Sequence, residues 1–464
     1  MGNAALMLRS LGHEVCGADQ RAYPPMSDLL AKSGVRVYEG YDAARLQTMQ
    51  VDSIVVGNAL SRGNEEIEWL LEKRSVPFTS LPALLGDTVL SGRTNIVVTG
   101  THGKTTTAAM AAVLLRAGGA EPGFFIGGVP NDLPGGAMLG RPDAPFVIEG
   151  DEYDSAFFDK RSKFVHYRPK IVAINNLEFD HCDIFRDLRD IQRSFEHLLK
   201  LMPRDGCLVV NGDDANVLEL LPVSWVDVFS VGIGESNDCR IRKFEEGADG
   251  VAFDLLWHGE HWASVRLRVP GLYNARNAAM AAVAVALTVR RGDPTGFDLS
   301  ALEAFHGVRR RQELVYSDDV VVVIEDFAHH PTALSAVLVS LRLRYPDARI
   351  VACFEPRSNT ARTKIFQGSF RDALEGADTV FIGAVDRADR LSVEDQLDTA
   401  RLAAELSVLP RTAFFFRDNR ELLRALVRDC RRWVSSPQVV VFFSNGSFGG
   451  IIKEFPDAWA VGRH

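Results

Sequence analysis

The chain has 464 residues, which is too long for one hydrophobic core and predicts two to four domains. Its 61 acidic and 52 basic residues leave a formal net charge of −9, which argues against a nucleic-acid or anionic-membrane partner because both favour a positive protein surface. No apolar run reaches the roughly 18 residues of a membrane helix, no signal peptide is recognisable, and six cysteines are scattered without a CxxC pair, so we expect a cytoplasmic protein with reduced, buried thiols.

Residues 1–92 alternate helix-like and strand-like segments, which predicts a Rossmann-like domain with a parallel sheet. "AALMLRSLGH" and "NEEIEWLLEKR" have helical spacing, whereas "EVCGAD", "VDSIVVGNAL" and "VPF" are typical of strands. The chain opens on the turn-like "MGNAA" and enters a helix at once. A dinucleotide-type fold begins with a strand that leads into a glycine turn, so we expect either that the natural start lies further upstream or that this first sheet lacks its first strand.

Residues 93–306 form a second series, which begins at "RTNIVVTG" and continues with predicted strands at "APFVIEG", "KIVAINN", "GCLVVNG" and "VDVFSVG". "VAFDLLWHGEHWASVRLRV" predicts a β-hairpin with its turn at His258-Gly259. The alanine-rich "NARNAAMAAVAVALTVRR" predicts a long helix.

Residues 307–464 form a third series. "VVVVIEDFAHHPTALSAVLVSLRLRY" predicts a strand, a turn and a helix, with Pro331 in the first helical turn. "ARIVACFEPRS", "ADTVFIGAV" and "QVVVFFSNGS" predict further buried strands. Taken together, the pattern predicts an α/β protein with domains at 1–92, 93–306 and 307–464.

"NIVVTGTHGKTTTAAM", residues 95–110, is similar to a phosphate-binding loop but departs from the Walker A spacing. A Walker A loop has a glycine six residues before its lysine; here that position is Val98, and the glycine that precedes Gly103 is Gly100, only four residues before Lys104. The context still fits a nucleotide, because a strand enters a glycine turn and a helix leaves it, so that backbone N–H groups face an anion. Lys104 would contact the outer phosphates and the Thr105 hydroxyl a magnesium ion. A glycine turn with one solvated lysine explains the bare motif about equally well, and the three consecutive threonines favour the nucleotide site.

Two more polar clusters follow predicted strands. "IEGDEYD" has four carboxylates within six residues, among them Glu152, and a cation near phosphates needs one or two carboxylates at a strand end. "NNLEFDHCD" has His181 between Asp180 and Asp183, where a carboxylate could orient the ring of a metal ligand. A solvated acidic loop and a structural histidine are the commoner alternatives for either cluster alone. Because ligands bind at the carboxyl ends of strands in open α/β sheets, the three clusters together favour one site.

The last third repeats this theme in "RRRQE", "EDFAHHP" and "FEPRSNT". The arginines of residues 309–311 lie at a predicted domain junction and suit bidentate recognition of phosphate or carboxylate. On charge alone, a solvated linker is the favoured explanation of this arginine run.

These motifs, in this order, resemble the Mur ligase family: three-domain, ATP-dependent amide ligases of peptidoglycan synthesis. The resemblance covers nearly the whole chain and is carried by "GTHGKTTT", "EGDEYD", "NNLEFDH", "GLYNARNA", "GVRRRQE" and "DFAHHP". It implies a Rossmann-like first domain that binds UDP-N-acetylmuramate, a P-loop-type central ATPase domain, and a Rossmann-like last domain that binds the second substrate and closes over ATP. The family's phosphate loop is short, as it is here.

The resemblance also implies roles for individual residues. ATP would be held by Gly100, Thr101, His102, Gly103, Lys104, Thr105, Thr106, Asn274, Asn277, Arg311, Asp326 and His329. The two asparagines would lie on the adenine side, and His102 would face the muramate carboxylate or its phosphate. Mg²⁺ would be bound by Thr105, Glu152 and His181. The catalytic residues would be Lys104, Glu152, His181, Arg311 and His102, and the substrates would contact Asn58, Arg62, Arg357, Ser358 and Asn359.

Two activities compete within the family's muramate-using branch, which lacks the carbamylated lysine of other members. No lysine occurs between His181 and Lys200, which fits this branch. One activity adds L-alanine to UDP-N-acetylmuramate; the other adds the preformed tripeptide L-alanyl-γ-D-glutamyl-meso-diaminopimelate during murein recycling. "FFDKRSKFVHYRP", "YPPMS", "GNALSRGN" and "FEPRSNT" are similar to the tripeptide ligase. Folylpolyglutamate synthase, which shares the ATP domain, and an inactive nucleotide-binding relative are the remaining alternatives. We expect a monomer or weak homodimer.

Overall fold

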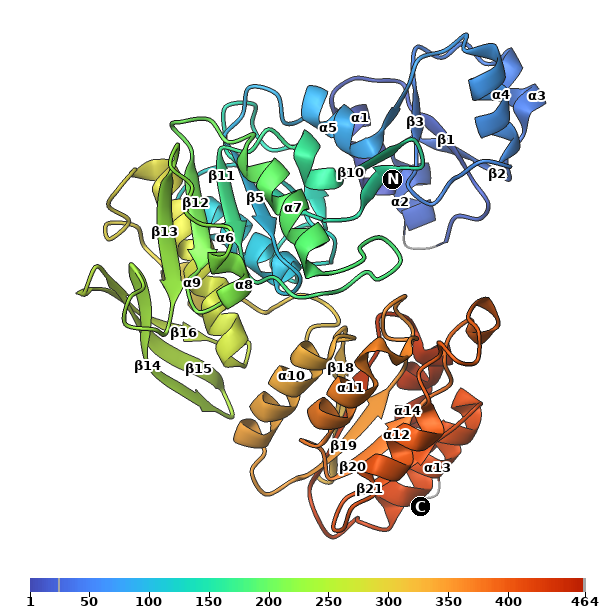
Figure 1. The fold of residues 1–464 in the computed structure, drawn as a ribbon, viewed down its shortest axis with the longest axis vertical. Helices are drawn as coiled ribbons and strands as arrows, with labels where there is room; N and C mark the ends of the chain where they lie inside the picture. Colours follow the sequence, from blue (N-terminus) through green and yellow to red (C-terminus); the bar gives the residue numbers. More distant parts are fainter. Residues whose placement is uncertain (24–25, 462–464) are drawn as a thin grey trace.

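The computed structural model describes residues 1–23 and 26–461 and divides them among three α/β parts, each built around its own strands (Figure 1). This is the predicted three-domain α/β architecture. The first part contains the helices α1 (Gly2–Ser10), α2 (Met26–Lys32), α3 (Ala43–Thr48), α4 (Glu65–Lys73) and α5 (Leu81–Asp87). Within the described residues, no helix combines the length and the apolarity needed to cross a bilayer.

The first part differs from the single parallel sheet that its sequence predicts. β1 (Cys16–Asp19) pairs in parallel with β2 (Arg36–Glu39), and β3 (Ile54–Val56) pairs in parallel with β4 (Phe78–Ser80). The parallel direction is confirmed, but the two pairs form separate two-stranded sheets, with no described strand hydrogen-bonded between them. Its helices begin where the sequence provides caps, for example at Asn64, whose side chain accepts hydrogen bonds from the second and third N–H groups of α4.

The central part is a ten-stranded mixed sheet of order β16-β15-β14-β13-β12-β11-β5-β8-β6-β7. All the strands predicted there are present: β5 (Asn95–Thr99), β8 (Phe146–Gly150), β11 (Ile171–Ile174), β12 (Cys207–Asn211), β13 (Asp227–Gly232), β15 (Gly250–Trp257) and β16 (Glu260–Leu267). The hairpin turns at His258-Gly259 as predicted. The third strand of this antiparallel extension, β14 (Cys239–Gly247), was not predicted. The short strands β6 (Gly123–Phe125), β7 (Ala137–Met138), β9 (Asp154–Ala156) and β10 (Asp159–Ser162) were not predicted either.

Helices cover both faces of the central sheet because successive strand residues point to opposite sides. In β5, Ile96 and Val98 face one core and Val97 faces the other. The first core contains α6 (Lys104–Ala117) and α9 (Leu272–Val289), which pack against each other through fully buried alanines. The second core contains α5, the 3₁₀ helix η1 (Lys163–His166), α7 (Leu188–Leu199) and α8 (Ala215–Leu218). Another 3₁₀ helix, η2 (Ser300–Ala304), ends this part.

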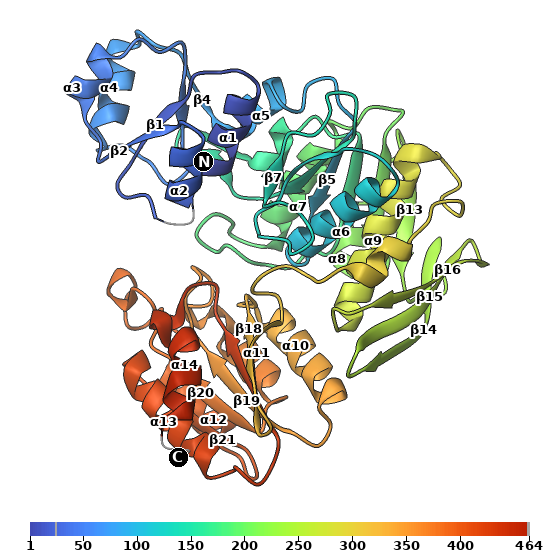
Figure 2. The same ribbon diagram turned by 180° about the vertical axis from the view of Figure 1, so that it is seen from behind.

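The C-terminal part is a six-stranded sheet of order β17-β18-β22-β19-β20-β21 (Figure 2). Its strands are β17 (Glu313–Ser317), β18 (Val321–Asp326), β19 (Arg349–Phe354), β20 (Thr379–Ile382), β21 (Thr412–Phe415) and β22 (Gln438–Phe443), of which β17 and β21 were not predicted. One face is covered by α10 (Pro331–Arg344), α11 (Gln367–Leu374) and α12 (Thr399–Leu406), and the other by α13 (Asn419–Arg431) and α14 (Ile451–Ala460). Short 3₁₀ turns complete it: η3 (Lys364–Phe366), η4 (Ala388–Arg390) and η5 (Phe448–Gly450).

The cysteines are all free, as predicted, but not all are buried. Cys16 is exposed at the edge of the small first sheet, and Cys182 is half-buried. The four others lie in the cores of the larger sheets.

The close contact between α5 and η1 makes a stability prediction. A Cβ atom added at Gly86 would lie 2.2 Å from the carbonyl oxygen of His166, which is backbone and has little freedom to move. We expect Gly86→Ala to lower the free energy of unfolding by about 1–3 kcal/mol through overpacking. Gly368→Ala is the matched control, because Gly368 is an exposed helical glycine with open space at its Cβ position. The control should be neutral or more stable by about 0.5–1 kcal/mol. Urea unfolding of both variants measures the difference, and an unchanged Gly86→Ala midpoint would contradict it.

Candidate active site

The carboxyl ends of the neighbouring parallel strands β5, β8 and β11 open into a cavity of about 1100 Å³. The C-terminal part supplies its opposite wall, including residues of β18 and the start of α10. Of the predicted site residues, the lining includes Thr101, His102, Gly103, Lys104, Thr105, Thr106, His181, Asn274, Asn277, Arg311, Asp326 and His329. The three clusters that follow separate strands in the sequence therefore meet at one place.

The loop between β5 and α6 has the geometry of an anion site. Gly100 and Gly103 have φ angles of 127° and 81°, and Gly103 is the N-cap of α6 with no side chain capping the first N–H groups. The loop also approaches its surroundings closely, because a Cβ atom on Gly103 would lie 2.4 Å from Oδ1 of Asn277. Asn176 holds the loop in place by accepting a 2.7 Å hydrogen bond from the His102 N–H. Uncapped N–H groups at the start of a helix favour a phosphate.

Lys104, Glu152 and His181 form one buried chain of contacts. Lys104 Nζ donates to the Gly100 carbonyl at 2.6 Å and to Glu152 Oε2 at 3.0 Å. Glu152 Oε1 lies 3.0 Å from Nε2 of His181. Burial alone would raise the pKa of the Glu152 carboxyl, but the charges of Lys104 and the contact with His181 outweigh it and lower that pKa to about 2. Burial likewise opposes the charge of Lys104, and Glu152 reverses the effect and raises the lysine pKa. The pair is therefore charged in the absence of any ligand.

Glu149 lies in the predicted acidic cluster "IEGDEYD", although the sequence predicted no individual role for it. Its Oε1 accepts a 2.9 Å hydrogen bond from the Thr105 hydroxyl, and its Oε2 accepts one of 2.7 Å from the N–H of Gly127. Burial and the nearby charge of Asp151 raise the pKa of Glu149. The set of Thr105, Glu149, Glu152 and His181 offers mainly hard oxygen donors beside an anion-binding loop, which fits a magnesium ion next to phosphates.

His181 is held in an unusual backbone conformation, with a φ of 58°. Asp180 Oδ1 accepts a 2.7 Å hydrogen bond from the His181 N–H, and the Tyr153 ring packs on the imidazole with the ring centroids 4.2 Å apart. Burial opposes ionisation of Asp180, but the neighbouring His329 imidazole, 3.7 Å away, and the charge of His181 hold its pKa well below the usual range. A left-handed φ at a non-glycine residue costs about 1–3 kcal/mol, so the surroundings of His181 hold its side chain in a specific direction.

Asn274 and Asn277 lie at the start of α9, beneath the phosphate loop. Asn274 Nδ2 donates to the Pro270 carbonyl at 2.6 Å, and Asn277 Nδ2 donates to Asn274 Oδ1 at 3.1 Å. Their neighbour Asn175 is buried, and its Oδ1 has no hydrogen-bond partner among the described residues. A buried polar oxygen without a partner at the edge of this cavity fits a site that a polar ligand completes.

The C-terminal wall is organised around Asp326. This buried carboxylate accepts hydrogen bonds from the backbone N–H groups of Gln312 at 2.8 Å and Ala328 at 2.7 Å. The Arg311 guanidinium lies over the Phe327 ring, 4.8 Å from its centroid, and faces the cavity. The expectation that the arginine run is a solvated linker is wrong for Arg310, whose Nε donates to Glu325 at 2.6 Å and whose Nη2 bonds backbone carbonyls near Ser444.

The residues predicted to contact the substrates lie away from the lining of this cavity. Asn58 and Arg62 are exposed in the first part, where Arg62 forms a 2.8 Å ion pair with Glu68. Arg357, Ser358 and Asn359 follow β19, and Asn359 Nδ2 donates a 2.7 Å hydrogen bond to Asp183 of the central part. Their substrate roles stay predictions.

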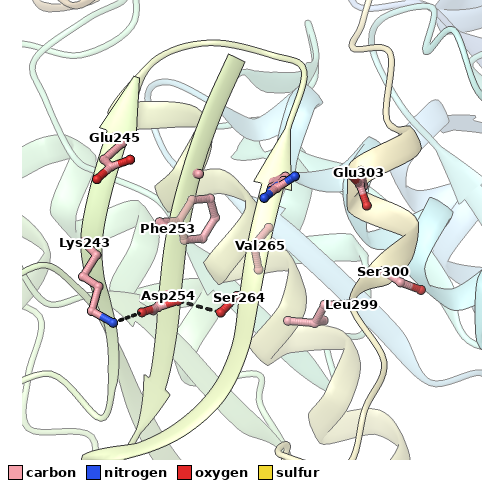
Figure 3. Close-up of a pocket in the computed structure, with 11 residues that line it drawn as sticks. Lys243, Glu245, Phe253, Asp254, Ser264, Val265, Leu299, Ser300 and Glu303 are labelled. Atoms are coloured by element: carbon pink, nitrogen blue, oxygen red, sulfur yellow. Dashed lines mark hydrogen bonds and ion pairs between the residues drawn. The ribbon is translucent and has the colours of Figure 1, made fainter. Parts of the chain in front are cut away.

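A second cavity, of about 420 Å³, lies between the outer strands β14–β16 and the chain around η2 (Figure 3). Lys243, Asp254 and Ser264 are joined across it by contacts of 2.9 and 2.7 Å, one residue from each strand. None of the predicted site residues lines this cavity, and its Lys243 and Asp254 are paired with each other across the strands. The chemistry therefore belongs to the larger cavity.

Three family models match the chain in order. Residues 1–92 match the "Mur ligase family, catalytic domain", residues 98–286 the "Mur ligase middle domain" and residues 310–446 the "Mur ligase, glutamate ligase domain". The chain belongs to the Mur ligase family. As a Mur ligase it is an ATP-dependent ligase, and the loop between β5 and α6 lies within the matched middle domain.

Individual relatives agree with this membership. The Mur ligase is 41% identical, over 99% of its length and 96% of the relative, to the UDP-N-acetylmuramate–L-alanyl-γ-D-glutamyl-meso-2,6-diaminoheptandioate ligase of Escherichia coli K12. A solved murein peptide ligase from Psychrobacter arcticus has 34% identity and a TM-score of 0.71, with 99% of this chain and 96% of that chain covered. This chain is also 32% identical, over 95% of its length and 89% of the relative, to the UDP-N-acetylmuramate–L-alanine ligase of Chlorobaculum tepidum.

The tight fit of the phosphate loop predicts the effect of a single methyl group. Gly103→Ala combines a φ of 81° with a contact of 2.4 Å to Asn277 Oδ1, so the loop must shift. We expect kcat to fall about 100-fold, because small displacements of positioned phosphates are costly. Gly259→Ala in the hairpin turn has a similar φ of 89° but open space, and it should leave kcat unchanged. Steady-state phosphate release measures kcat for both variants. An equal fall in kcat for Gly103→Ala and Gly259→Ala would show that backbone strain alone, and not the contact with Asn277, lowers kcat.

Proposed function

We propose that this Mur ligase joins the tripeptide L-alanyl-γ-D-glutamyl-meso-diaminopimelate to the lactyl carboxylate of UDP-N-acetylmuramate, with cleavage of ATP, in murein recycling. The observation that carries the proposal is the 41% identity, over almost the full length of both chains, to a relative named for this reaction. The charged and buried Lys104–Glu152 pair at the phosphate loop supports an active enzyme over an inactive nucleotide-binding relative.

The proposed reaction needs an activated carboxylate. Bound ATP supplies the phosphoryl group that converts the lactyl carboxylate into an acyl phosphate, and Mg²⁺ offsets the negative charge of the phosphates. The α6 N–H groups and Lys104 bind and orient the phosphates, and they stabilise the oxyanion that forms when the peptide amine attacks the acyl carbon. The amine then loses a proton and inorganic phosphate leaves, so that the amide bond replaces the acyl phosphate bond. Thr105, Glu149, Glu152 and His181 are the residues that would hold Mg²⁺. Arg311, Asp326 and His329 bring the C-terminal wall against the site and exclude water, which would hydrolyse the acyl phosphate.

The substrate assignments are part of the same proposal. Asn58 and Arg62 would contact UDP-N-acetylmuramate, and Arg357, Ser358 and Asn359 the tripeptide, whose free carboxylates suit cationic and amide donors. His102 would face the reacting carboxylate or its phosphate. We also propose that this Mur ligase is located in the cytoplasm, because its nucleotide substrates are made there. We further propose that it is a monomer or weak homodimer without nucleic-acid or membrane partners.

The second candidate function is the L-alanine ligase, since a relative named for that reaction is 32% identical, less than the 41% of the relative named for the tripeptide reaction. The segment "FFDKRSKFVHYRP", which includes β10 and η1, favours the tripeptide ligase.

A panel of amine acceptors distinguishes the two functions. Phosphate release is measured with ATP, Mg²⁺ and UDP-N-acetylmuramate, and with alanine, dipeptide, tripeptide or tetrapeptide as the acceptor. We expect release with the tripeptide and none with alanine, and none when either ATP or UDP-N-acetylmuramate is omitted. Release with alanine and not with tripeptide would overturn the proposal in favour of the alanine ligase. No release with any acceptor would favour the inactive relative.

A further inference from the structure

His102, Glu178 and His330 lie together beside the main cavity, apart from the Glu152–His181 pair. One ligand atom of each lies within 4.8 Å of the others. His102 Nε2 is 2.8 Å and His330 Nδ1 is 3.2 Å from the same oxygen of Glu178, Oε2, and the two imidazole centroids are 4.8 Å apart. His102 comes from the phosphate loop and Glu178 from the segment after β11, whereas His330 is the N-cap of α10 in the C-terminal part.

The bonding of His330 leaves one of its ring nitrogens unexplained. Nε2 lies 3.3 Å from the Phe179 carbonyl oxygen. A carbonyl oxygen can only accept a hydrogen bond, so Nε2 is protonated and donates it. In the neutral ring Nδ1 then presents a lone pair to a carboxylate oxygen. Nδ1 is fully buried and has no hydrogen-bond partner among the described residues. Burial and the neighbouring His102 also favour the neutral ring, since they lower the pKa of His330 to about 4.

A cation between His330 Nδ1 and the Glu178 carboxylate oxygen would accept a lone pair from each of these two atoms. Two imidazoles and one carboxylate are the donor set of many zinc sites, with ligand atoms about 2.0–2.2 Å from the metal, whereas Mg²⁺ prefers oxygen donors. We propose that His102, Glu178 and His330 form a binding site for a divalent transition-metal ion of the zinc class, separate from the magnesium site of the ligase reaction.

The surroundings orient these three ligands as the partners of metal ligands usually do. The Thr332 hydroxyl donates a 2.8 Å hydrogen bond to the other Glu178 oxygen, Oε1. The Glu178 N–H donates a 2.9 Å hydrogen bond to the Thr101 hydroxyl, and the Phe366 ring packs edge-on against His330. His102 and Glu178 line the cavity and are partly exposed, which leaves an entry path and an open coordination position.

The site also joins two parts of the protein. Two ligands belong to the central part and one to the C-terminal part, so the ion is bound only where the two parts meet as in this structure. A bound ion would therefore stabilise this arrangement and restrain His102, which lies in the phosphate loop.

Metal titration tests the proposal without relying on turnover. The full-length protein is titrated calorimetrically with Zn²⁺ in excess Mg²⁺, and separately with Co²⁺, whose visible absorption reports tetrahedral coordination. We expect one Zn²⁺ per chain and Co²⁺ bands that Zn²⁺ displaces. His330→Gln and His102→Gln should each weaken Zn²⁺ binding at least about 10-fold and remove the bands. Hydrogen exchange in residues 327–333 should slow on Zn²⁺ binding in the native chain only.

Two controls identify the place where the ion binds. His181→Ala removes the histidine of the magnesium site, and His261→Ala removes an exposed histidine of the outer hairpin; both variants should keep the Zn²⁺ site. No stoichiometric Zn²⁺ binding by the native chain would overturn the proposal. Binding that survives in His102→Gln and is lost in His181→Ala would overturn it as well. If His330→Gln does not fold, the His102→Gln variant decides the outcome, because its side chain is partly exposed.

Discussion

Lys104→Met is expected to lower kcat by about 10²- to 10³-fold, the usual cost of removing one preorganised group that stabilises developing negative charge. Lys104 is the cation at the start of α6, and its Nζ lies between the Gly100 carbonyl and Glu152 in a buried position. Methionine keeps much of the side-chain volume and removes only the charge and the hydrogen bonds. The measurement is phosphate release under saturating substrates.

Lys243→Met is the matched control for this variant. Lys243 also forms a lysine–carboxylate pair, with Asp254 at 2.9 Å, but it is exposed and lies on the outer hairpin. Its loss should leave kcat within about a factor of two, because surface ion pairs contribute about 0–1 kcal/mol. Equal losses in the two variants, or a near-normal rate in Lys104→Met, would remove Lys104 from the site.

The same variant has a stability signature. Removing one partner of a buried ion pair costs about 3–5 kcal/mol, because the remaining carboxylate is buried without compensation. In the native chain burial alone would raise the pKa of Glu152, but Lys104 and His181 outweigh burial and lower this pKa from 4.5 to about 2. Its stabilisation is therefore fully present above about pH 4.5 and is lost as the pH falls towards 2. The difference in unfolding free energy between native and Lys104→Met should thus be large at pH 7 and shrink below pH 4.5. A difference that does not depend on pH would contradict the charge pairing.

His181→Gly is expected to raise the Mg²⁺ concentration for half-maximal activity by at least about 10-fold without lowering stability in proportion. His181 lies 3.0 Å from Glu152 and has a φ of 58°, a conformation that glycine adopts without strain. The substitution therefore removes a proposed metal ligand and relieves backbone strain of about 1–3 kcal/mol at the same time. The relief offsets part of the packing lost against Tyr153.

His181→Asn is the companion variant, because asparagine also tolerates a left-handed conformation and keeps a polar side chain. We expect it to show an intermediate magnesium requirement. Activity measured across a magnesium series, together with thermal unfolding, separates the two effects. A fall in kcat with an unchanged magnesium requirement would show that His181 acts on packing or orientation and not on the metal.

Local sequence patterns were sufficient for much of the fold. The strands at β5, β8 and β11 are short apolar runs followed by turn residues, and these depend on neighbours within a few positions. Strands whose own residues do not form an apolar run were not predicted, because their pairing partners lie outside this local range. β14 reads "CRIRKFEEG", a polar sequence that becomes a strand because it pairs with β13 and β15, and the sequence contains no signal of that pairing.

The first domain shows where periodicity fails. Its four strands are three or four residues long, and most of their residues are exposed or only partly buried. The sequence predicted parallel pairing correctly, but the number of sheets depends on which strands come to lie side by side, and this is a property of topology.

The sequence by itself determined that Lys104, Glu152 and His181 follow strands and that the chain resembles a Mur ligase, because motif spacing and strand ends are local properties. Only the tertiary structure decided which other groups complete the site. Glu149 contacts Thr105 because β8 lies beside β5, and Glu178 meets His102 and His330 because the C-terminal part packs against the end of β11. These contacts join residues that are far apart in the chain, from 44 positions for Thr105 and Glu149 to 228 for His102 and His330. Such contacts depend on sheet order and domain packing, which no window of neighbouring residues encodes.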